Sequence, residues 1–347
     1  MPDSVARIDG LAFCGCSGLT ELTLPNSVKS IGDGAFTDCS GLEKITVESG
    51  NSRYDSRDNC NSIIDKKTNT LIAGCKNSVI PNSVARIDGL AFCGCSGLTE
   101  LTLPNSVKSI GDGAFTDCSG LEKITVESGN SCYDSRDNCN SIIETETNTL
   151  IAGCKNSVIP NSVTSIGNSA FCGCSGLTEL TLPSSVTRIG NSAFEGCSGL
   201  TELTLPNSVM SIGRSAFYGC SGLTELTLPS SVTRIGNSAF EGCSGLTELT
   251  LPNSVMSIGR SAFGGCSGLT ELTLPNSVTS IGGYAFAYCS GLSKITSLAE
   301  IPPVCGYGVF DGVNKTNCEL IVPKGSVAAY KQAYGWNGFS NIRGFSE

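Results

Sequence analysis

The sequence contains no histidine, few charged residues and no long apolar run. Without histidine, the chain cannot form a serine–histidine–aspartate triad, a cysteine–histidine pair or a histidine metal site. Charged residues make up 15% of the 347 residues and the net charge is -9, whereas nucleic-acid binding needs a basic surface. No stretch approaches the ~20 apolar residues that a membrane-spanning helix requires. We therefore expect no enzyme, no nucleic-acid binding and no membrane span.

The most abundant feature of the sequence is repetition. Residues 177–222 recur as 223–268 with one change, Tyr218 to Gly264, and each 46-residue block holds two 23-residue units. The unit follows the pattern L-x-x-L-x-L-P-x-S-V-x-x-I-G-x-x-A-F-x-G-C-S-G. A period of about 20–50 residues is typical of a solenoid, in which each coil buries its apolar face against the next. The pattern therefore predicts one core that grows along a single axis.

The apolar positions of the unit predict how each coil winds. Leu22 and Leu24 alternate as in a β-strand, and Pro25 ends that strand because it lacks an N–H group. The return path would hold short turns or 3-10 segments. Ten cysteines share one position in it, which indicates a column of small buried side chains rather than a disulfide framework. They are Cys16, Cys39, Cys95, Cys118, Cys174, Cys197, Cys220, Cys243, Cys266 and Cys289.

Two coils are longer, and their extra residues predict β-hairpin insertions near 51–77 and 130–156. Pairing around the tip Lys66–Asn69 would set Ile63 opposite Ile72 and Cys60 opposite Cys75. The second copy would set Cys139 opposite Cys154. Opposed residues have Cβ atoms ~4.5–5.5 Å apart, close to disulfide range. Two interpretations remain open, a disulfide in each hairpin or pairs of buried thiols.

The repeat pattern decays after Gly291. Residues 318–323 predict a last strand, and Ser326 is a candidate N-cap for a helix in VAAYKQAYGW. Trp336, Phe339 and Phe345 would cover the open end of the stack. We expect a solenoid of about 12–13 coils over residues 1–300 and a capping segment with a strand and a short helix over 301–347.

The segment LTELTL matches a leucine-rich repeat strand, and PxSVxxIGxxAFxxCSGL resembles the BspA-like leucine-rich repeats of bacterial surface proteins over roughly residues 1–300. The tail over residues 301–342 is similar to the C-terminal ends of such proteins from Bacteroides-type bacteria. The resemblance implies an α/β repeat solenoid, wound as a right-handed superhelix with a parallel β-sheet on one face. It also implies export, and for some members binding of host matrix proteins or neighbouring cells. Ser27 and its equivalents stand where the usual repeat asparagine is expected, so serine would substitute for an asparagine ladder.

No cofactor or metal site is expected. Zinc held by cysteine alone needs paired C-x2-C motifs, whereas this chain has C-G-C triplets at 14–16, 93–95 and 172–174. The triplets lie 79 residues apart, which predicts that several coils separate them. Their first cysteines, Cys14, Cys93 and Cys172, occupy a variable position, so we expect exposed thiols without a role.

The outward positions of the strands form the candidate binding surface. Five consecutive strands carry glutamate and threonine at the same two outward positions. These residues are Glu179, Glu202, Glu225, Glu248 and Glu271, with Thr181, Thr204, Thr227, Thr250 and Thr273. Unit charges ~4.8 Å apart repel by roughly 0.9 kcal/mol in water, less than the ~1.5–3 kcal/mol that each buried leucine contributes. The row is therefore either a solvated face or a site for a basic partner segment or cations.

These observations favour a non-enzymatic, surface-exposed protein-binding or adhesion module that engages its ligand through the strand-bearing face. The alternative is an architectural spacer within a longer secreted protein. Because the chain begins in mid-repeat, we expect a fragment of a protein located at the cell surface or secreted. The expected partners are host or neighbouring-cell proteins, and we expect a monomer.

Overall fold

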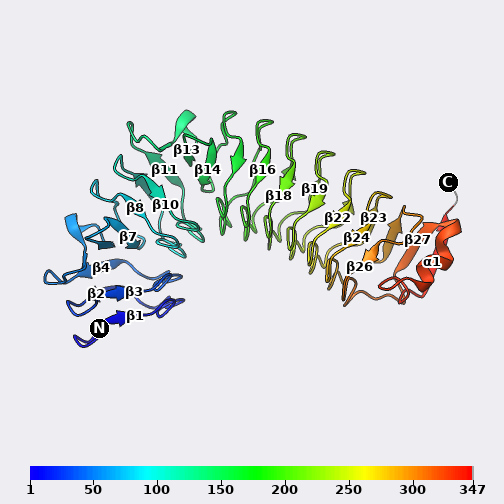
Figure 1. Cartoon of the computed structure of the whole chain (residues 1–347), viewed down its shortest axis with the longest axis horizontal. Helices are drawn as coiled ribbons and strands as arrows, with labels where there is room; N and C mark the ends of the chain where they lie inside the picture. The colour runs from blue at the N-terminus through cyan, green and yellow to red at the C-terminus, as the bar shows by residue number, and fades with distance from the viewer. Residues whose placement is uncertain (346–347) are drawn as a thin grey trace. The chain divides into compact units, whose positions relative to one another are not determined.

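The computed structural model describes residues 1–345, so the last two residues of the predicted capping segment lie outside it. The chain forms two compact units. Unit 1 comprises Met1–Pro160 with Gly167–Gly176, and unit 2 comprises Asn161–Ile166 with the chain from Leu177 onward. Each unit is a stack of coils whose strands pair in parallel (Figure 1). Within residues 1–345, no helix is long and apolar enough to cross a membrane.

The strand-bearing face of each unit is built from the L-x-x-L-x-L segments. In unit 1, β2 (Glu21–Leu24) pairs with β4 (Lys44–Val47), and β9 (Glu100–Leu103) pairs with β11 (Lys123–Val126). In unit 2, β17 (Glu202–Thr204) pairs with β19 (Glu225–Thr227). A second sheet follows with β21 (Glu248–Thr250), β23 (Glu271–Leu274), β25 (Lys294–Ser297), β27 (Glu319–Pro323) and β28 (Asn341–Phe345). The leucines point inward and are buried, which confirms the predicted parallel-strand solenoid. The right-handed winding stays a prediction.

The return path holds the predicted turns and, in addition, a second ladder of two-residue strands between them. Unit 1 contributes β1 (Arg7–Ile8), β3 (Ser30–Ile31), β8 (Arg86–Ile87) and β10 (Ser109–Ile110). Unit 2 contributes β15 (Ser165–Ile166), β16 (Arg188–Ile189), β18 (Ser211–Ile212), β20 (Arg234–Ile235), β22 (Ser257–Ile258), β24 (Ser280–Ile281) and β26 (Val304–Cys305). Stacking the isoleucines brings backbone groups of successive coils together, and buried backbone groups must pair.

Phenylalanine and cysteine columns fill the core of unit 2. The rings of Phe194, Phe217, Phe240, Phe263, Phe286 and Phe310 stack with centroids 5.1–5.8 Å apart. The cysteines of four successive coils do more than fill space, because their thiols donate to phenylalanine carbonyls of the preceding coils. Cys243 Sγ lies 3.3 Å from the Phe217 oxygen, and Cys289 Sγ lies 3.1 Å from the Phe263 oxygen. The predicted cysteine column is thus confirmed, except that Cys16 in the first coil is exposed.

A serine ladder joins the turns of unit 2, as the sequence predicts. The hydroxyl of Ser208 donates to the Val186 carbonyl at 2.6 Å, and equivalent bonds recur in the coils around it. In unit 1 the equivalent hydroxyls of Ser27 and Ser106 are buried without a partner. In the coil that follows Ser106, the amide of Asn130 donates to the Val107 carbonyl at 3.1 Å, so an asparagine of the insertion takes the role of that coil's serine.

The two insertions each form three antiparallel strands. The first holds β5 (Tyr54–Asp55), β6 (Ile63–Asp65) and β7 (Thr70–Ala73), with the 3-10 segment η1 (Arg57–Asn59). The second holds β12 (Tyr133–Asp134), β13 (Ile142–Glu144) and β14 (Thr149–Ala152), with η2 (Arg136–Asn138). The tip closes with Asp65 opposite Thr70 and Ile64 opposite Leu71.

An ion pair between Arg53 and Asp65 occurs in the first insertion and has no equivalent in the second. Arg53 Nε lies 2.7 Å from the nearly buried Asp65 carboxylate, which also accepts the backbone N–H groups of Lys67 and Thr68. Burial alone would raise the pKa of Asp65, but the hydrogen bonds from Arg53, Thr68 and Lys67 lower it below its ordinary value. In the second copy, Cys132 and Glu144 occupy these positions, so the pair is lost.

The C-terminal segment packs aromatic rings onto the last phenylalanine of the core. Trp336 and Phe339 are buried against Phe310, and the Trp336 indole N–H donates to the Pro303 carbonyl at 2.9 Å. The predicted last strand is β27, preceding η3 (Lys324–Ser326). The predicted helix is α1 (Val327–Gln332), shorter than expected and capped at Ser326 without a side-chain bond.

The C-terminal segment differs from the sequence analysis in two ways. Strand β28 (Asn341–Phe345) was not predicted, and Phe345, which was expected to cover the open end of the stack, is only half-buried. The parallel ladder continues through β27 and β28. The division into a solenoid up to residue 300 and a cap after it stays a prediction.

We predict that Ser231→Ala lowers the free energy of unfolding by about 1 kcal/mol, because it leaves the Val209 carbonyl without its donor. The matched variant Ser106→Ala removes a buried hydroxyl that has no partner and should leave stability unchanged or higher. Urea unfolding followed by circular dichroism compares the two. Equal losses would contradict the serine ladder.

We predict that Asp65→Asn destabilises the chain by about 1.5–3 kcal/mol at neutral pH, the usual contribution of hydrogen bonds to a charged group. A carboxyl with a lowered folded-state pKa stabilises the fold above its unfolded pKa and loses this contribution as pH falls through the folded pKa. The gap between wild type and variant should therefore close in acid. Glu144→Gln, which breaks no ion pair in the described residues, is the control. A gap independent of pH would refute the assignment.

Candidate functional site

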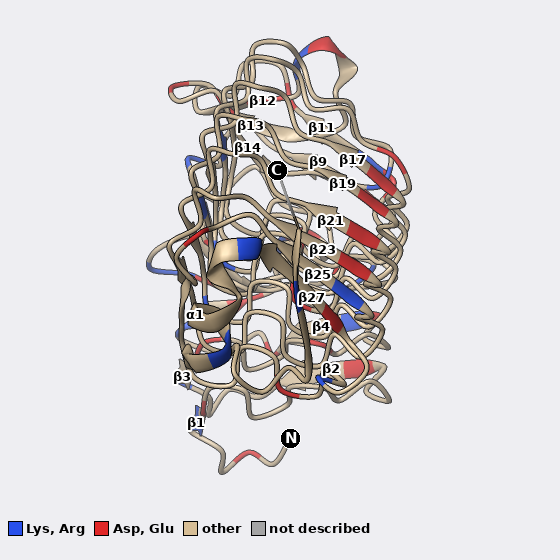
Figure 2. Ribbon diagram, turned by 90° about the vertical axis from the view of Figure 1, so that its right-hand side faces the viewer, with Lys and Arg blue, Asp and Glu red and all other residues tan. Residues whose placement is uncertain are grey.

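The glutamate column lies on the strand-bearing face of unit 2, as the sequence predicts. All five side chains are exposed. Glu202 stands opposite Glu225 in the β17–β19 ladder, and Glu248 stands opposite Glu271 in the β21–β23 ladder. Figure 2 shows these four acidic strands following one another along one face. Glu179 precedes them in a segment without strand pairing.

The column ends at a cation. Lys294 stands opposite Glu271 in the ladder, and its Nζ lies 3.0 Å from the Glu271 carboxylate. In the described residues, no lysine or arginine pairs with Glu202, Glu225 or Glu248. The other four carboxylates of the column therefore face solvent, and the lysine at its end reaches only Glu271.

Threonine forms the adjacent column. Thr204 stands opposite Thr227, and Thr250 stands opposite Thr273. Four of the five threonines are exposed, and Thr273 is half-buried. Hydroxyls next to carboxylates offer both donors and acceptors to a partner.

The same positions in unit 1 have a different charge pattern. Glu21 stands opposite Lys44, and Glu100 stands opposite Lys123 with 3.5 Å between carboxylate and ammonium. Opposite charges facing each other across a ladder offset one another. The acidic surface is therefore a property of unit 2 rather than of the repeat as such.

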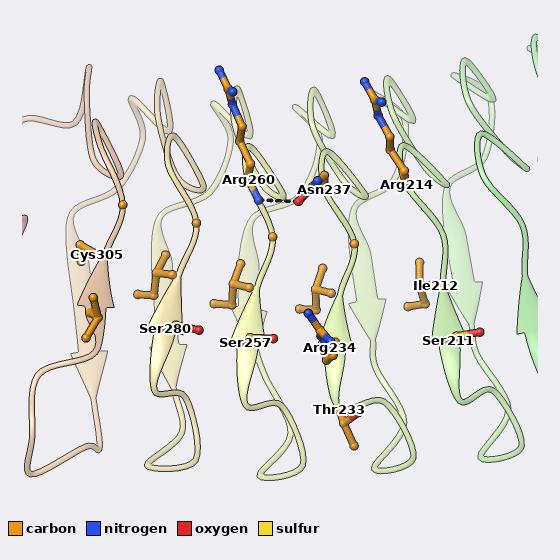
Figure 3. A pocket seen from close by; sticks show the side chains of 18 of the residues that line it. Ser211, Ile212, Arg214, Thr233, Arg234, Asn237, Ser257, Arg260, Ser280 and Cys305 are labelled. Carbon is orange, nitrogen blue, oxygen red and sulfur yellow. Dashed lines mark hydrogen bonds between the residues drawn. The ribbon is translucent and has the colours of Figure 1, made fainter.

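The return ladder of unit 2 carries an open groove of about 850 Å³ that the sequence analysis did not anticipate. Arg214, Arg234 and Arg260 line it, and none of them pairs with a carboxylate in the described residues. Figure 3 shows Arg214 and Arg260 projecting at the same edge, with the Asn237 side chain accepting the Arg260 backbone N–H at 2.9 Å. Serine, glycine and isoleucine make up much of the remaining lining, so within residues 1–345 the arginines are the only charged side chains that line the groove.

Unit 1 contains a row of thiols and carboxylates that the sequence analysis placed several coils apart. The Asp38 backbone N–H donates to the Cys93 carbonyl at 3.0 Å, and the Asp117 N–H donates to the Cys172 carbonyl at 2.9 Å. Cys14 Sγ lies 3.8 Å from the Asp38 carboxylate. The expectation of exposed thiols holds for Cys14 but is wrong for Cys93 and Cys172, each only 9% exposed.

The geometry of the long coil explains this correction. In it, Ala73-Gly74-Cys75 replaces the A-F-x-x-C segment, so the coil contributes no residue at the position of Asp38. Asp38 and Cys93 become direct neighbours as a result. The shortened segment can be read from the sequence, and it could have predicted the contact between Asp38 and Cys93.

Cys93 lies between two carboxylates. One ligand-forming atom from each of Asp38, Cys93 and Asp117 lies within 4.8 Å of the others. Burial, and then the negative charges of Asp38 and Asp117, raise the pKa of the Cys93 thiol to about 12. The thiol is therefore protonated at neutral pH, and in residues 1–345 it makes no side-chain hydrogen bond.

The hairpin cysteines do not oppose each other as the sequence register predicts. A bulge between Ile63 and Ile64 pairs Ile63 with Ala73 instead of Ile72, and this shift displaces the residues that follow. Cys60 packs in a cluster with Ile64 and Leu71, whereas Cys75 packs in a different cluster.

Cys139 and Cys154 are likewise buried free thiols behind the corresponding bulge. Because an extra residue inverts the facing of a strand's side chains, we interpret the cysteines of both insertions as buried thiols.

Comparison with known proteins identifies the family of the repeat. A family model described as BspA type leucine rich repeat region, of six copies, matches residues 1–72, 62–154, 151–266 and 211–320. A leucine-rich repeat protein from Eubacterium ventriosum is 25% identical, with a TM-score of 0.65 over 85% of this chain and 83% of that chain. A leucine rich cell surface protein from Faecalibacterium prausnitzii is 25% identical, with a TM-score of 0.53 over 84% and 83% of the chains. No curated protein matches the chain.

We predict that Cys60, Cys75, Cys139 and Cys154 remain thiols in the folded protein. Denaturation in the presence of an alkylating reagent, without reductant, should label all four in peptide mass spectrometry. A cross-linked peptide joining Cys60 to Cys75, or Cys139 to Cys154, would contradict this prediction and restore the bridge.

Proposed function

Because the chain belongs to the BspA-type leucine-rich repeat family, we propose that it is a non-enzymatic protein-binding or adhesion module. Its ligand engages the strand-bearing face of unit 2 through the glutamate and threonine columns. The partner is a host or neighbouring-cell protein that presents a basic segment. The protein acts at the cell surface or after secretion, a location supported by the description of the Faecalibacterium relative as a cell surface protein.

The observation that carries this proposal is the contrast between the two units. The repeat places glutamate on the strand-bearing face of both, yet unit 1 faces each of Glu21 and Glu100 with a lysine. Unit 2 aligns Glu202 with Glu225 and Glu248 with Glu271 instead. A row of carboxylates in which only Glu271 has a lysine beside it attracts a partner of the opposite sign and speeds its association.

The row is compatible with the fold because the core outweighs it. Repulsion between neighbouring carboxylates costs roughly 0.9 kcal/mol in water at ~4.8 Å, and salt reduces it further. Each buried leucine beneath the row contributes ~1.5–3 kcal/mol. The face therefore tolerates a binding surface made of like charges.

The second candidate function is an architectural spacer without a ligand. The observation that favours it is the near-identity of residues 177–222 and 223–268, since duplication alone lays out such columns. The two functions differ in whether the isolated chain binds any partner through this face.

We predict that the triple variant Glu202→Gln, Glu225→Gln, Glu248→Gln weakens binding to extracellular host proteins at least tenfold and flattens its salt dependence. Surface plasmon resonance of the whole chain against a panel of matrix proteins, at low and physiological salt, measures both. The matched control is Glu21→Gln, Glu100→Gln, Asp33→Asn, which removes equal charge from unit 1 and should bind as wild type does.

Three results are informative. Equal weakening by both triple variants would show a net-charge effect and refute the unit 2 site. Unchanged binding by the unit 2 variant would refute the column as the ligand surface. Absence of any binding partner, together with a small gain in stability of the unit 2 variant at neutral pH, would favour the spacer.

A further inference from the structure

The row of thiols and carboxylates on unit 1 contains one position where both neighbours of a cysteine are aspartates. Cys93 has Asp38 on one side and Asp117 on the other, and the three ligand atoms lie within 4.8 Å of one another. We propose that Asp38, Cys93 and Asp117 form a zinc-binding site. The proposal is independent of protein binding by unit 2.

The thiol supplies the first line of support. Cys93 is 9% exposed, and its Sγ is directed toward the two carboxylates without a hydrogen bond in residues 1–345. Cysteines of the core column, by contrast, have a carbonyl acceptor, such as the Phe92 oxygen for Cys118 at 3.2 Å. A buried sulfur that lacks such a partner, and faces two carboxylates, has the environment of a metal ligand.

The donor set selects the metal. Thiolate ligands favour zinc over calcium and magnesium, and zinc also accepts carboxylate oxygen. Bond lengths of about 2.3 Å to sulfur and about 2.1 Å to oxygen place the ligand atoms of a tetrahedral zinc about 3.6 Å apart. The ligand atoms here lie within 4.8 Å of one another, so they need to approach by no more than about 1.2 Å, which the exposed aspartate side chains allow. Water completes the coordination on the exposed side.

Binding exchanges a proton for the metal. Zn²⁺ forms a bond to Cys93 Sγ, the S–H bond breaks, and the proton goes to solvent. Zinc, one thiolate and two carboxylates carry a net charge of -1, whereas the empty site carries two carboxylate charges. No redox change and no second reactant is involved.

The 79-residue duplication makes this site unique within the row. In residues 1–345, the group with metal-ligand spacing contains Cys93 but neither Cys14, whose thiol lies by Asp38, nor Cys172, whose backbone carbonyl accepts the Asp117 N–H. Cys93 is the junction at which the second copy meets the first, so it alone has an aspartate from each copy. Cys172 shares its repeat position and its 9% exposure, and so provides a matched control.

The experiment measures zinc stoichiometry on the reduced, chelator-treated full chain by equilibrium dialysis and native mass spectrometry. We expect Cys93→Ser to bind one zinc fewer than wild type, and Asp38→Asn and Asp117→Asn to weaken that zinc at least tenfold. Asn keeps the positive φ of these positions, 57° for Asp38 and 56° for Asp117, so the backbone is retained. Cys172→Ser should bind as wild type does.

Cobalt provides a readout specific to the ligand. Co²⁺ added to the zinc-free chain should give a thiolate-to-metal charge-transfer band that Cys93→Ser abolishes and Cys172→Ser retains. Circular dichroism of each variant checks folding. Equal loss of metal in Cys93→Ser and Cys172→Ser, or full zinc affinity in Asp38→Asn together with Asp117→Asn, would overturn the proposal.

Discussion

Every coil of this chain is completed by its neighbour, and this dependence underlies the rest of the structure. The Cys243 thiol has its acceptor in the preceding coil, the Ser208 hydroxyl has its acceptor in the preceding coil, and each phenylalanine ring stacks on the next. Burial keeps such thiols protonated, raising the pKa of Cys220 to about 12, so they remain donors. A coil in isolation would lose all these interactions at once, which is why stability resides in the stack.

Because the inward residues make the contacts that stabilise the stack, the outward residues are free to differ between the units. On the strand-bearing face, unit 1 pairs Glu100 with Lys123, whereas unit 2 aligns Glu202 with Glu225. At one turn, unit 1 has Asp38 and Asp117 with positive φ, where unit 2 has glycines such as Gly219. One scaffold thus offers an acidic sheet in one unit and a mixed thiol–carboxylate row in the other.

The sequence predicted most of what repeats, although not the two-residue strands of the return path, and was insufficient where repetition is broken. Leucine alternation, the cysteine column and the serine ladder follow from the 23-residue pattern, since each position meets its own copy in the next coil. The bulge between Ile63 and Ile64 has no periodic signal, because a single extra residue shifts the facing of those after it. The contact of Asp38 with Cys93 depends on a loop that the intervening coil lacks. The arginine groove draws Arg214 and Arg260 from one position of the repeat and Arg234 from another, in alternate units, so no single 23-residue unit contains the whole set.

The near-identity of residues 177–222 and 223–268 has a consequence for how such a chain changes over generations. Recombination between the two blocks would remove or add 46 residues in frame, and every new junction would restore the same stacking, thiol and hydroxyl contacts. The length of unit 2 is therefore open to variation without a penalty in folding. Each such event would also add or remove two glutamates of the acidic column, so the length of the strand-bearing face and its negative charge would change together.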